Sequence, residues 1–264
     1  MIASVSSDIG ASLARHFLAR NDKVCGTYRN LAHVSEDLKG GDVRLFQCDV
    51  NSNVEVDTLK QRLRMEGVKW DLFISAVGVL EPIGNFFDLD FAQWEKSVVT
   101  NSLSQLRLLH GLYEFRATDR MANVVFFAGG GTNGTFDNFS AYCVGKIALI
   151  KMCELLDSEC PDLHVSILGT GWVRTKIHEQ TVAAGENSGG NLERTQKFLE
   201  SNFPGTSLAD IANCIEWCVR APKSATSGRN FSIVHDKWKE GHELLASLES
   251  NRDKFKLRRF GNVS

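Results

Sequence analysis

The sequence predicts an α/β protein: a doubly wound parallel sheet of about seven strands with helices on both faces. Short runs rich in β-branched and aromatic residues alternate with segments of helical periodicity along the whole chain. Such alternation implies right-handed crossovers between parallel strands. The 264 residues are 43% hydrophobic and 23% charged, as in soluble globular proteins with a large core. We therefore expect a single domain over residues 1–264.

Seven runs have the length and composition of buried strands. They lie at residues 2–5, 23–28, 43–48, 71–77, 123–129, 164–169 and 229–234. The first is short for the centre of a sheet, because only two residues precede Ala3. Either the chain begins late through truncation or this strand is genuinely abbreviated.

Helical periodicity fills the gaps between these runs. Apolar residues recur at helical spacing after the first and third strands, and longer helices are expected around 90–116, 139–159 and 207–220. The stretch 176–205 is the least regular and follows the sixth strand, which predicts a mobile substrate lid. Residues 236–264 extend past the last strand and are expected to form a helix and a tail.

Composition excludes several classes of partner. The net charge of −2 does not favour nucleic acid or an anionic membrane, and no apolar run approaches 18 residues. No signal peptide is expected. The seven scattered cysteines contain no CxxC pair and are expected to be buried free thiols in a reducing cytoplasm; Cys214 and Cys218 fit a core stripe. The histidines lack metal-ligand spacing, and only His178 is expected to face a substrate.

Tyr142 and Lys146 carry the main chemical signal. On a helix they lie one turn apart on the same face. An ammonium beside a phenol favours the phenolate, so the tyrosine can exchange a proton near neutral pH. A chance Tyr-x-x-x-Lys is common, and its ordinary meaning is an exposed pair on a helix. The predicted βαβ pattern around it, with Asn101 upstream, favours an active site.

The turn between the first strand and the first helix has the form of a dinucleotide-binding turn. Gly10 is its only glycine; its remaining candidate cofactor residues are Ser4, Ser7, Asp8 and Ile9. Ser4 takes a tight turn without the conformational freedom of glycine, at a cost of about 1 kcal/mol. Asp8 could cap the helix, or it could stand near the cofactor phosphates and repel them.

Taken together, these residues resemble the short-chain dehydrogenase/reductase superfamily, in order over residues 3–235. The resemblance implies a Rossmann-type fold with Tyr142 as acid/base. It implies that Lys146 lowers the tyrosine pKa and binds the nicotinamide ribose, and that Asn101 holds a helix kink and a water. It also implies further cofactor contacts along the strand ends: Asp49, Val50, Ser75, Ala76, Gly171, Val173 and Thr175.

Arg29 bears on the choice of cofactor. It follows the second strand, where an NAD enzyme commonly has an acidic residue that binds the ribose hydroxyls. Arginine pairs instead with a 2′-phosphate, which favours NADP, with NAD as the alternative. A merely solvated arginine at a strand end is the plain alternative.

Gly129 is the main departure from the family pattern, which has a catalytic serine thirteen residues before the tyrosine. Removing a donor to the substrate oxygen costs roughly 10²–10³ in turnover. Thr132, Ser140 or backbone amides of residues 129–131 could supply a replacement, although Ser140 could equally be a helix N-cap. A flexible glycine turn with no role is the alternative.

The resemblance implies an NAD(P)-dependent oxidoreductase acting on a carbonyl or hydroxyl group. Residues 140–157, the HDKWK segment and the terminal LRRF are similar to members associated with surface-polysaccharide genes, which makes a sugar-linked substrate one candidate. A nucleotide-binding or regulatory protein without turnover is the alternative. Apolar residues on more than one face of the helices around Asn101 and Tyr142 predict a homodimer or homotetramer.

Overall fold

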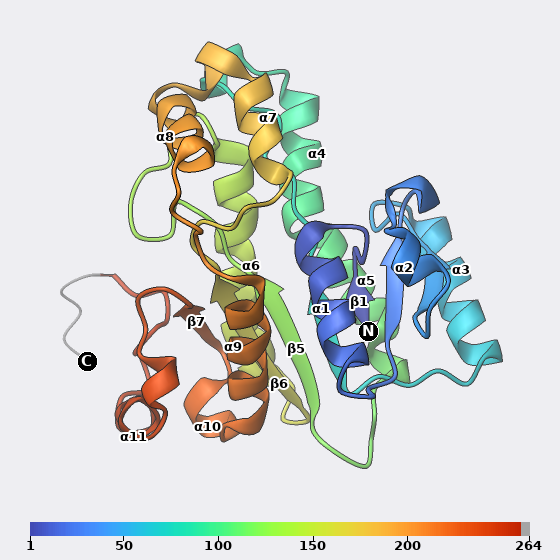
Figure 1. Ribbon diagram of the computed structural model, residues 1–264. Helices are drawn as coiled ribbons and strands as arrows, with labels where there is room; N and C mark the ends of the chain where they lie inside the picture. The colour runs from blue at the N-terminus through green and yellow to red at the C-terminus, as the bar shows by residue number, and fades with distance from the viewer. Residues whose placement is uncertain (260–264) are drawn as a thin grey trace.

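The computed structural model describes residues 1–259 and contains one seven-stranded sheet in which every pairing is parallel. The strands follow the order β3-β2-β1-β4-β5-β6-β7 across the sheet (Figure 1). They are β1 (Ile2–Ala3), β2 (Cys25–Tyr28), β3 (Arg44–Gln47), β4 (Leu72–Ser75), β5 (Ala122–Phe127), β6 (Leu163–Gly169) and β7 (Arg229–Ser232). All seven strands lie within one or two residues of the predicted runs.

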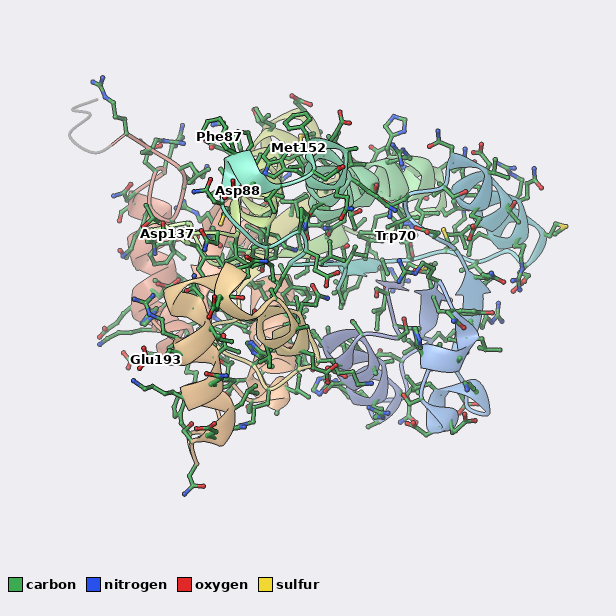
Figure 2. All side chains as sticks on the ribbon, turned by 90° about the horizontal axis from the view of Figure 1, so that it is seen from above. Trp70, Phe87, Asp88, Asp137, Met152 and Glu193 are labelled. Carbon is green, nitrogen blue, oxygen red and sulfur yellow. The ribbon has the colours of Figure 1, made fainter. Side chains whose placement is uncertain are left out.

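Helices cover both faces of the sheet, as the view from above shows (Figure 2). One layer contains α3 (Asn53–Met65), α5 (Leu103–Leu112) and α6 (Ser140–Glu159), whose buried side chains share a core with β3 to β6. The other contains α1 (Asp8–Leu18), α2 (Glu36–Lys39), α9 (Leu208–Arg220) and α11 (His242–Ser250). Cys214 and Cys218 lie in this second core, and all seven cysteines are free thiols.

The chain reverses its strand order beside β1, which pairs with β2 on one side and β4 on the other. In doubly wound sheets the ligand site lies at this switch point, outside the carboxyl ends of the strands. β1 is only two residues long, so the loop after it begins deep in the sheet. That loop leads directly into α1, at the predicted nucleotide turn.

The predicted helix at 90–116 is two helices. The first, α4 (Phe91–Asn101), ends where Ser102 leaves helical geometry (φ −138°, ψ −77°), and α5 begins at Leu103. The break therefore follows Asn101 directly. A short 3₁₀ turn, Tyr113–Phe115, completes this stretch.

The predicted irregular stretch 176–205 is largely helical. It contains α7 (Ile177–Ala183), a 3₁₀ turn at Gly185–Ser188 and α8 (Gly190–Glu200). The glycines of this stretch made it look irregular in the sequence, but they lie between the helices. Gly185 begins the 3₁₀ turn and Gly189 separates it from α8, and both have positive φ.

Arg229 anchors the C-terminal extension to β7. Its buried guanidinium donates hydrogen bonds to the backbone carbonyls of Leu248, Asn251 and Lys254 after and within α11. A short helix, α10 (Lys223–Thr226), precedes β7. The last five residues of the predicted extension 236–264 lie outside the described residues. Within the described chain, no helix has the length and apolar character needed to span a membrane.

Candidate active site

Tyr142 and Lys146 lie one turn apart on the first half of α6, and both side chains are buried. The Lys146 ammonium lies 5.7 Å from the centre of the Tyr142 ring. Its Nζ donates a hydrogen bond to the Val77 carbonyl at 3.2 Å, beyond the carboxyl end of β4. The predicted pair is therefore not an exposed tyrosine and lysine on a helix surface.

Asn101 is held against the same loop. Its Nδ2 donates to the Val79 carbonyl at 2.8 Å, and the Val79 amide donates back to its Oδ1 at 3.1 Å. A Cβ placed on Gly78 would lie 3.7 Å from Lys146 Nζ and 3.8 Å from Asn101 Oδ1. The polar ends of Lys146 and Asn101 therefore both lie close to Gly78, on the same side of the sheet.

Gly145 makes this arrangement possible. A Cβ at this position would lie 2.6 Å from the Cβ of Asn101 and 3.3 Å from the Val98 carbonyl. Real Cβ atoms do not approach so closely, so any larger residue would push α6 away from α4.

Gln105 was missed by sequence reasoning and organises the layer beneath the site. Its buried amide donates to the Asn101 carbonyl at 2.9 Å, and its Oε1 accepts from Ser75 Oγ at 2.7 Å. Ser75, a predicted cofactor contact, therefore points its hydroxyl into this network. No spacing rule distinguishes such a glutamine from any other on a helix.

Gly129 leaves a gap that the Tyr142 phenol fills. A Cβ built on Gly129 would collide with the phenol, lying 2.5 Å from its Cε1 carbon. Within residues 1–259 the Tyr142 hydroxyl makes no hydrogen bond. The ring packs in a small apolar cluster with Leu80, Ile83 and Phe139.

Burial shifts both titrating groups toward their neutral forms. Removal from water raises the pKa of the Tyr142 phenol well above its ordinary value and lowers the pKa of the Lys146 ammonium to about 8. Burial is the main cause of the raised tyrosine pKa, and the role of Lys146 in lowering it stays a prediction. At neutral pH the phenol therefore carries its proton.

The two residues offered in place of the absent serine already have other partners. The Thr132 hydroxyl donates to the Gly129 carbonyl at 3.2 Å. Ser140 is the first residue of α6 and not its N-cap, which is Phe139; its Oγ accepts a hydrogen bond from Trp94 Nε1 at 2.9 Å.

The segment predicted to be a lid, 176–205, packs over the tyrosine cluster. Gln180 Oε1 on α7 accepts from the Leu80 amide at 2.7 Å, and Ile177 and Ala184 pack against the cluster. Two further hydrogen bonds join the lid to the loop before α6: Asn138 Nδ2 to the Asn187 carbonyl at 2.8 Å, and Asn191 Nδ2 to the Asp137 carbonyl at 3.0 Å.

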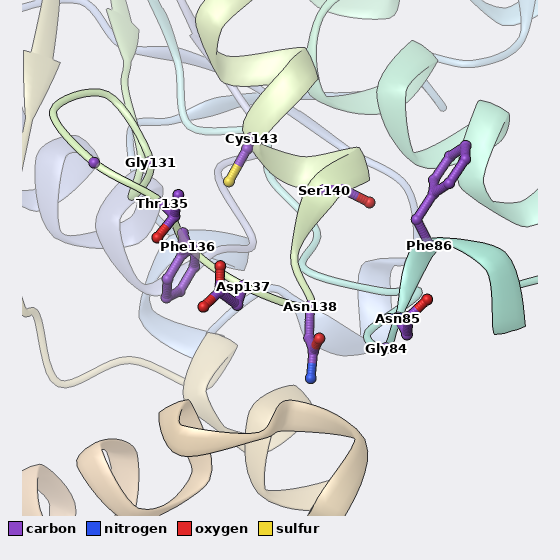
Figure 3. Close-up of a pocket in the computed structure, with 11 residues that line it drawn as sticks. Gly84, Asn85, Phe86, Gly131, Thr135, Phe136, Asp137, Asn138, Ser140 and Cys143 are labelled. Carbon is purple, nitrogen blue, oxygen red and sulfur yellow. The ribbon is translucent and has the colours of Figure 1, made fainter.

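A cavity of about 670 Å³ lies beside this cluster (Figure 3). One wall is the segment 84–86, and the other is the loop and first turn of α6 over residues 131–143. Tyr142 does not line it, although the next residue, Cys143, does. His178 does not line it either: its ring stacks on Trp172, and its Nε2 lies 2.8 Å from the Val173 carbonyl.

The predicted nucleotide turn is tight and strained. Ser4 has positive φ (62°), a conformation that costs a non-glycine residue roughly 1–2 kcal/mol. Ser7 is the N-cap of α1, since its Oγ accepts from the Gly10 amide at 3.1 Å. A Cβ on Gly10 would collide with the Ser4 carbonyl oxygen, so only glycine fits there. Ile9 packs against the core beneath.

Asp8 does not cap α1. It is the first helical residue, and its Oδ2 accepts a hydrogen bond from the Lys176 amide at 2.6 Å, where the lid begins. A carboxylate at a helix N-terminus is itself stabilised by the helix dipole, which is also the attraction that a cofactor phosphate would use. Asp8 thus joins the nucleotide turn to the lid.

The other predicted cofactor residues follow strands along the same edge of the sheet. Arg29 is exposed after β2 and has no ion pair within the described chain. After β3, the Asp49 Oδ1 accepts from the Asn51 amide at 2.9 Å, and Val50 is buried. Ala76 follows β4, while Gly171 (φ 67°), Val173 and Thr175 follow β6.

This edge suits an NAD(P) dinucleotide with one opposing charge. Gly10 allows the backbone to approach closely at the start of α1, Arg29 offers a free cation, and Lys146 lies at the other end of the edge. The Asp8 carboxylate opposes phosphate binding. No group of histidine, cysteine or carboxylate side chains suited to a metal ion occurs among residues 1–259.

Comparison with known proteins gives a consistent result. A family model described as short chain dehydrogenase matches residues 1–185. An uncharacterized oxidoreductase of Saccharomyces cerevisiae is 27% identical over 232 residues, covering 80% of this chain and 88% of that protein. A benzil reductase of the same yeast, which forms (S)-benzoin, is 23% identical over the same shares.

Solved structures share the fold. The crystal structure of a short chain dehydrogenase/reductase from Saccharomyces cerevisiae has a TM-score of 0.78 at 21% identity, covering 94% of this chain and 97% of its own. That of the KRED1-Pglu enzyme also has a TM-score of 0.78, at 22% identity and with 87% and 98% coverage.

The buried charge of Lys146 should lower stability. Its pKa is about 8 in the folded protein against 10.5 in an unfolded chain, so the unfolded state binds more protons between these values and stability rises with pH across them. One pKa unit corresponds to about 1.4 kcal/mol, so Lys146→Met should stabilise the protein by roughly 1–3 kcal/mol at pH 7. The gain should shrink between pH 8 and 10.

Urea unfolding of both proteins at several pH values measures this difference. Lys151→Met is the matched control: it lies on the same helix with a half-exposed side chain and should change stability by less than about 0.5 kcal/mol. A Lys146→Met protein that is less stable than the parent at pH 7 would show that the bond to Val77 outweighs the cost of burial.

Proposed function

The chain belongs to the short chain dehydrogenase family and is an NAD(P)-dependent oxidoreductase, and from this premise we propose that it reduces a carbonyl group with NADPH. Tyr142, Lys146 and Asn101 are the proposed catalytic residues. The observation that carries the proposal is the closeness of the Lys146 and Asn101 side chains to Gly78, one helical turn from Tyr142.

The protonation state of Tyr142 favours reduction over oxidation. When bound, the nicotinamide supplies a hydride to the carbonyl carbon, and the oxygen then needs a proton. A phenol with a raised pKa holds its proton at neutral pH and can donate it, whereas oxidation would require the phenolate. Lys146, charged below a pKa of about 8, then stabilises the phenolate that remains.

Asn101 acts by position. Its two hydrogen bonds with Val79 hold the loop after β4, and the helix break at Ser102 directs its backbone carbonyl toward Gln105. Lys146 is tied to the same loop through Val77. Both residues therefore fix the floor on which the nicotinamide ribose would rest.

Gly129 supports a second candidate function. The phenol occupies the gap at Gly129 without a hydrogen bond, and the two nearby hydroxyls, of Thr132 and Ser140, are already bonded elsewhere. A protein that binds the dinucleotide without efficient turnover would have these features. Detectable NADPH binding without reduction of any carbonyl compound would favour it.

We also propose a homodimer, with a homotetramer as the larger alternative, working in the cytoplasm. Several apolar residues of the helices around Asn101 and Tyr142 are buried in the core of the single chain. They are Leu108, Leu109, Leu112, Leu149 and Ile150. The surplus that supports a dimer is smaller and lies on the outer side of α4, α5 and α6. It comprises Phe91, Leu103, Val144 and Leu155.

Light scattering at micromolar concentration should give the mass of a dimer or tetramer, because these exposed side chains would be buried across a two-fold axis. Val144→Glu should shift the mass toward the monomer, since it places a charge in the apolar face. Val182→Glu, an equally exposed valine on the lid, is the control and should not change the mass. A parent protein that is monomeric would contradict the assembly.

NADPH should bind more tightly than NADH because Arg29 can pair with the 2′-phosphate. A charge-assisted hydrogen bond contributes about 1.5–3 kcal/mol, so Arg29→Ala should weaken NADPH binding by roughly 10- to 100-fold and leave NADH little changed. Fluorescence titration measures both. Arg44→Ala is the control. Arg44 begins β3, so it lies at the amino ends of the strands, whereas Arg29 follows the carboxyl end of β2. Equal affinities of the parent protein for NADPH and NADH would contradict this prediction.

Gly129→Ser and Gly129→Ala together test the missing donor. Both side chains must displace the phenol from the gap, but only serine adds a hydroxyl. We expect serine to raise turnover of a simple ketone by up to about 10²–10³-fold and alanine to leave it unchanged or lower. Equal gains would mean that phenol displacement alone matters. Losses in both would show that Tyr142 needs the gap.

A further inference from the structure

The cavity beside the tyrosine cluster has an aromatic lining. Its apolar lining comes from Phe86 and Phe136, and Phe136 stacks on Phe139 with ring centres 4.4 Å apart. Phe139 in turn packs against Tyr142. The cavity therefore adjoins the proposed proton donor across one layer of aromatic rings, and it is placed to hold a part of the substrate that does not react.

Aromatic surface continues outward from the cavity wall. Phe86 contacts Phe87 and Trp94 with ring centres 5.2 Å and 5.6 Å apart. Phe87 is 90% exposed, more than any other large hydrophobic side chain in the described part of the chain. Trp94 Nε1 is fixed to Ser140, a cavity-lining residue, so these rings are tied to the wall. Such a surface suits an aromatic or aliphatic group.

The charge in the cavity lining is negative. Asp137 is the only charged residue in its lining, and within the described chain its carboxylate has no cationic partner. Lysine and arginine lie just outside the three segments that enclose the cavity and the tyrosine cluster, 79–95, 128–145 and 177–193: Lys96, Lys146, Lys176 and Arg194 are the adjoining residues. The segments carry eight carboxylates: Glu81, Asp88, Asp90, Glu95, Asp137, Glu179, Glu186 and Glu193.

This asymmetry is local, because the whole chain carries a net charge of only −2. Seen from above, Asp88 lies beside Phe87, with Asp137 and Glu193 at the same end of the molecule (Figure 2). Of the eight carboxylates, Glu193 is paired, with Lys197 at 2.6 Å, and the Asp90 carboxylate accepts from the Gln93 amide at the start of α4. Inside the cavity lining an anionic group would meet the Asp137 carboxylate without a lysine or arginine beside it.

We propose that the substrate carries a bulky apolar or aromatic group without negative charge, held by Phe86 and Phe136 in this cavity. The Asp137 carboxylate in the lining disfavours anionic carriers, such as coenzyme A thioesters or nucleotide-linked sugars. This inference rests on the proposed carbonyl reduction. It makes Phe86 and Asp137 specificity-determining residues and leaves the proton donor unchanged.

A series of aryl methyl ketones tests this, with the ring bearing a methyl, a trimethylammonium or a carboxylate group. With NADPH at low ionic strength, kcat/KM should be at least roughly fivefold higher for the neutral and cationic ketones than for the carboxylate. The difference should narrow in 0.5 M salt, because exposed charges are screened. Asp137→Asn should narrow it too, whereas Asp119→Asn, near the amino end of β5, should not.

Phe86→Ala tests the aromatic wall. It should lower kcat/KM for the neutral aryl ketone about tenfold, mainly through KM, and leave 2-butanone unchanged. Phe203→Ala is the control, since Phe203 is also exposed to solvent (61%, against 42% for Phe86) and lies outside the cavity lining. Melting curves confirm that each variant is folded.

The outcomes separate the two proposals. If NADPH binds but none of the ketones is reduced, the proposed function falls and this inference falls with it. If the ketones are reduced and the carboxylate is used as well as the neutral compound, the inference alone is wrong. The same holds if Phe86→Ala affects 2-butanone and the aryl ketone equally.

Discussion

The close approach of α6 to α4 at Gly145 is the constraint on which the site depends. Only a residue without a side chain lets the Asn101 backbone pack directly against α6. From that contact the Lys146 and Asn101 side chains both reach the loop after β4, where they bond to Val77 and Val79. Gln105 secures the layer below through Asn101 and Ser75. The loop, two helices and their side chains thus form one hydrogen-bonded unit.

Burial controls the chemistry of this unit more than charge pairing does. The Tyr142 phenol is held against Gly129 under Leu80 and the predicted lid segment, where desolvation favours its protonated form. The same desolvation makes the Lys146 ammonium costly, a cost retained where function needs the charge. The start of the predicted lid segment is joined to the predicted nucleotide turn by the hydrogen bond from the Lys176 amide to Asp8.

The molecule separates charge between its two ligand regions. The edge proposed for the cofactor offers Arg29 and Lys146, while the lining of the cavity carries Asp137 and no lysine or arginine. A dinucleotide is anionic and needs cations, whereas a neutral ketone does not. Because exposed charges act over about 10 Å at moderate salt, each region can select its own ligand. The low net charge of the whole chain conceals this division.

The sequence by itself determined the sheet, since alternating apolar runs and helical periodicity leave few arrangements other than a doubly wound fold. It also determined that Tyr142 and Lys146 share a helix face, because their spacing is local. What lies between distant segments could not be read from it. The filling of the Gly129 gap by the Tyr142 phenol, the Gln105 network, the helical lid and the bond from Asp8 to Lys176 all join residues far apart in the chain. Such contacts depend on how closely packed elements approach one another, and only the tertiary structure decides that.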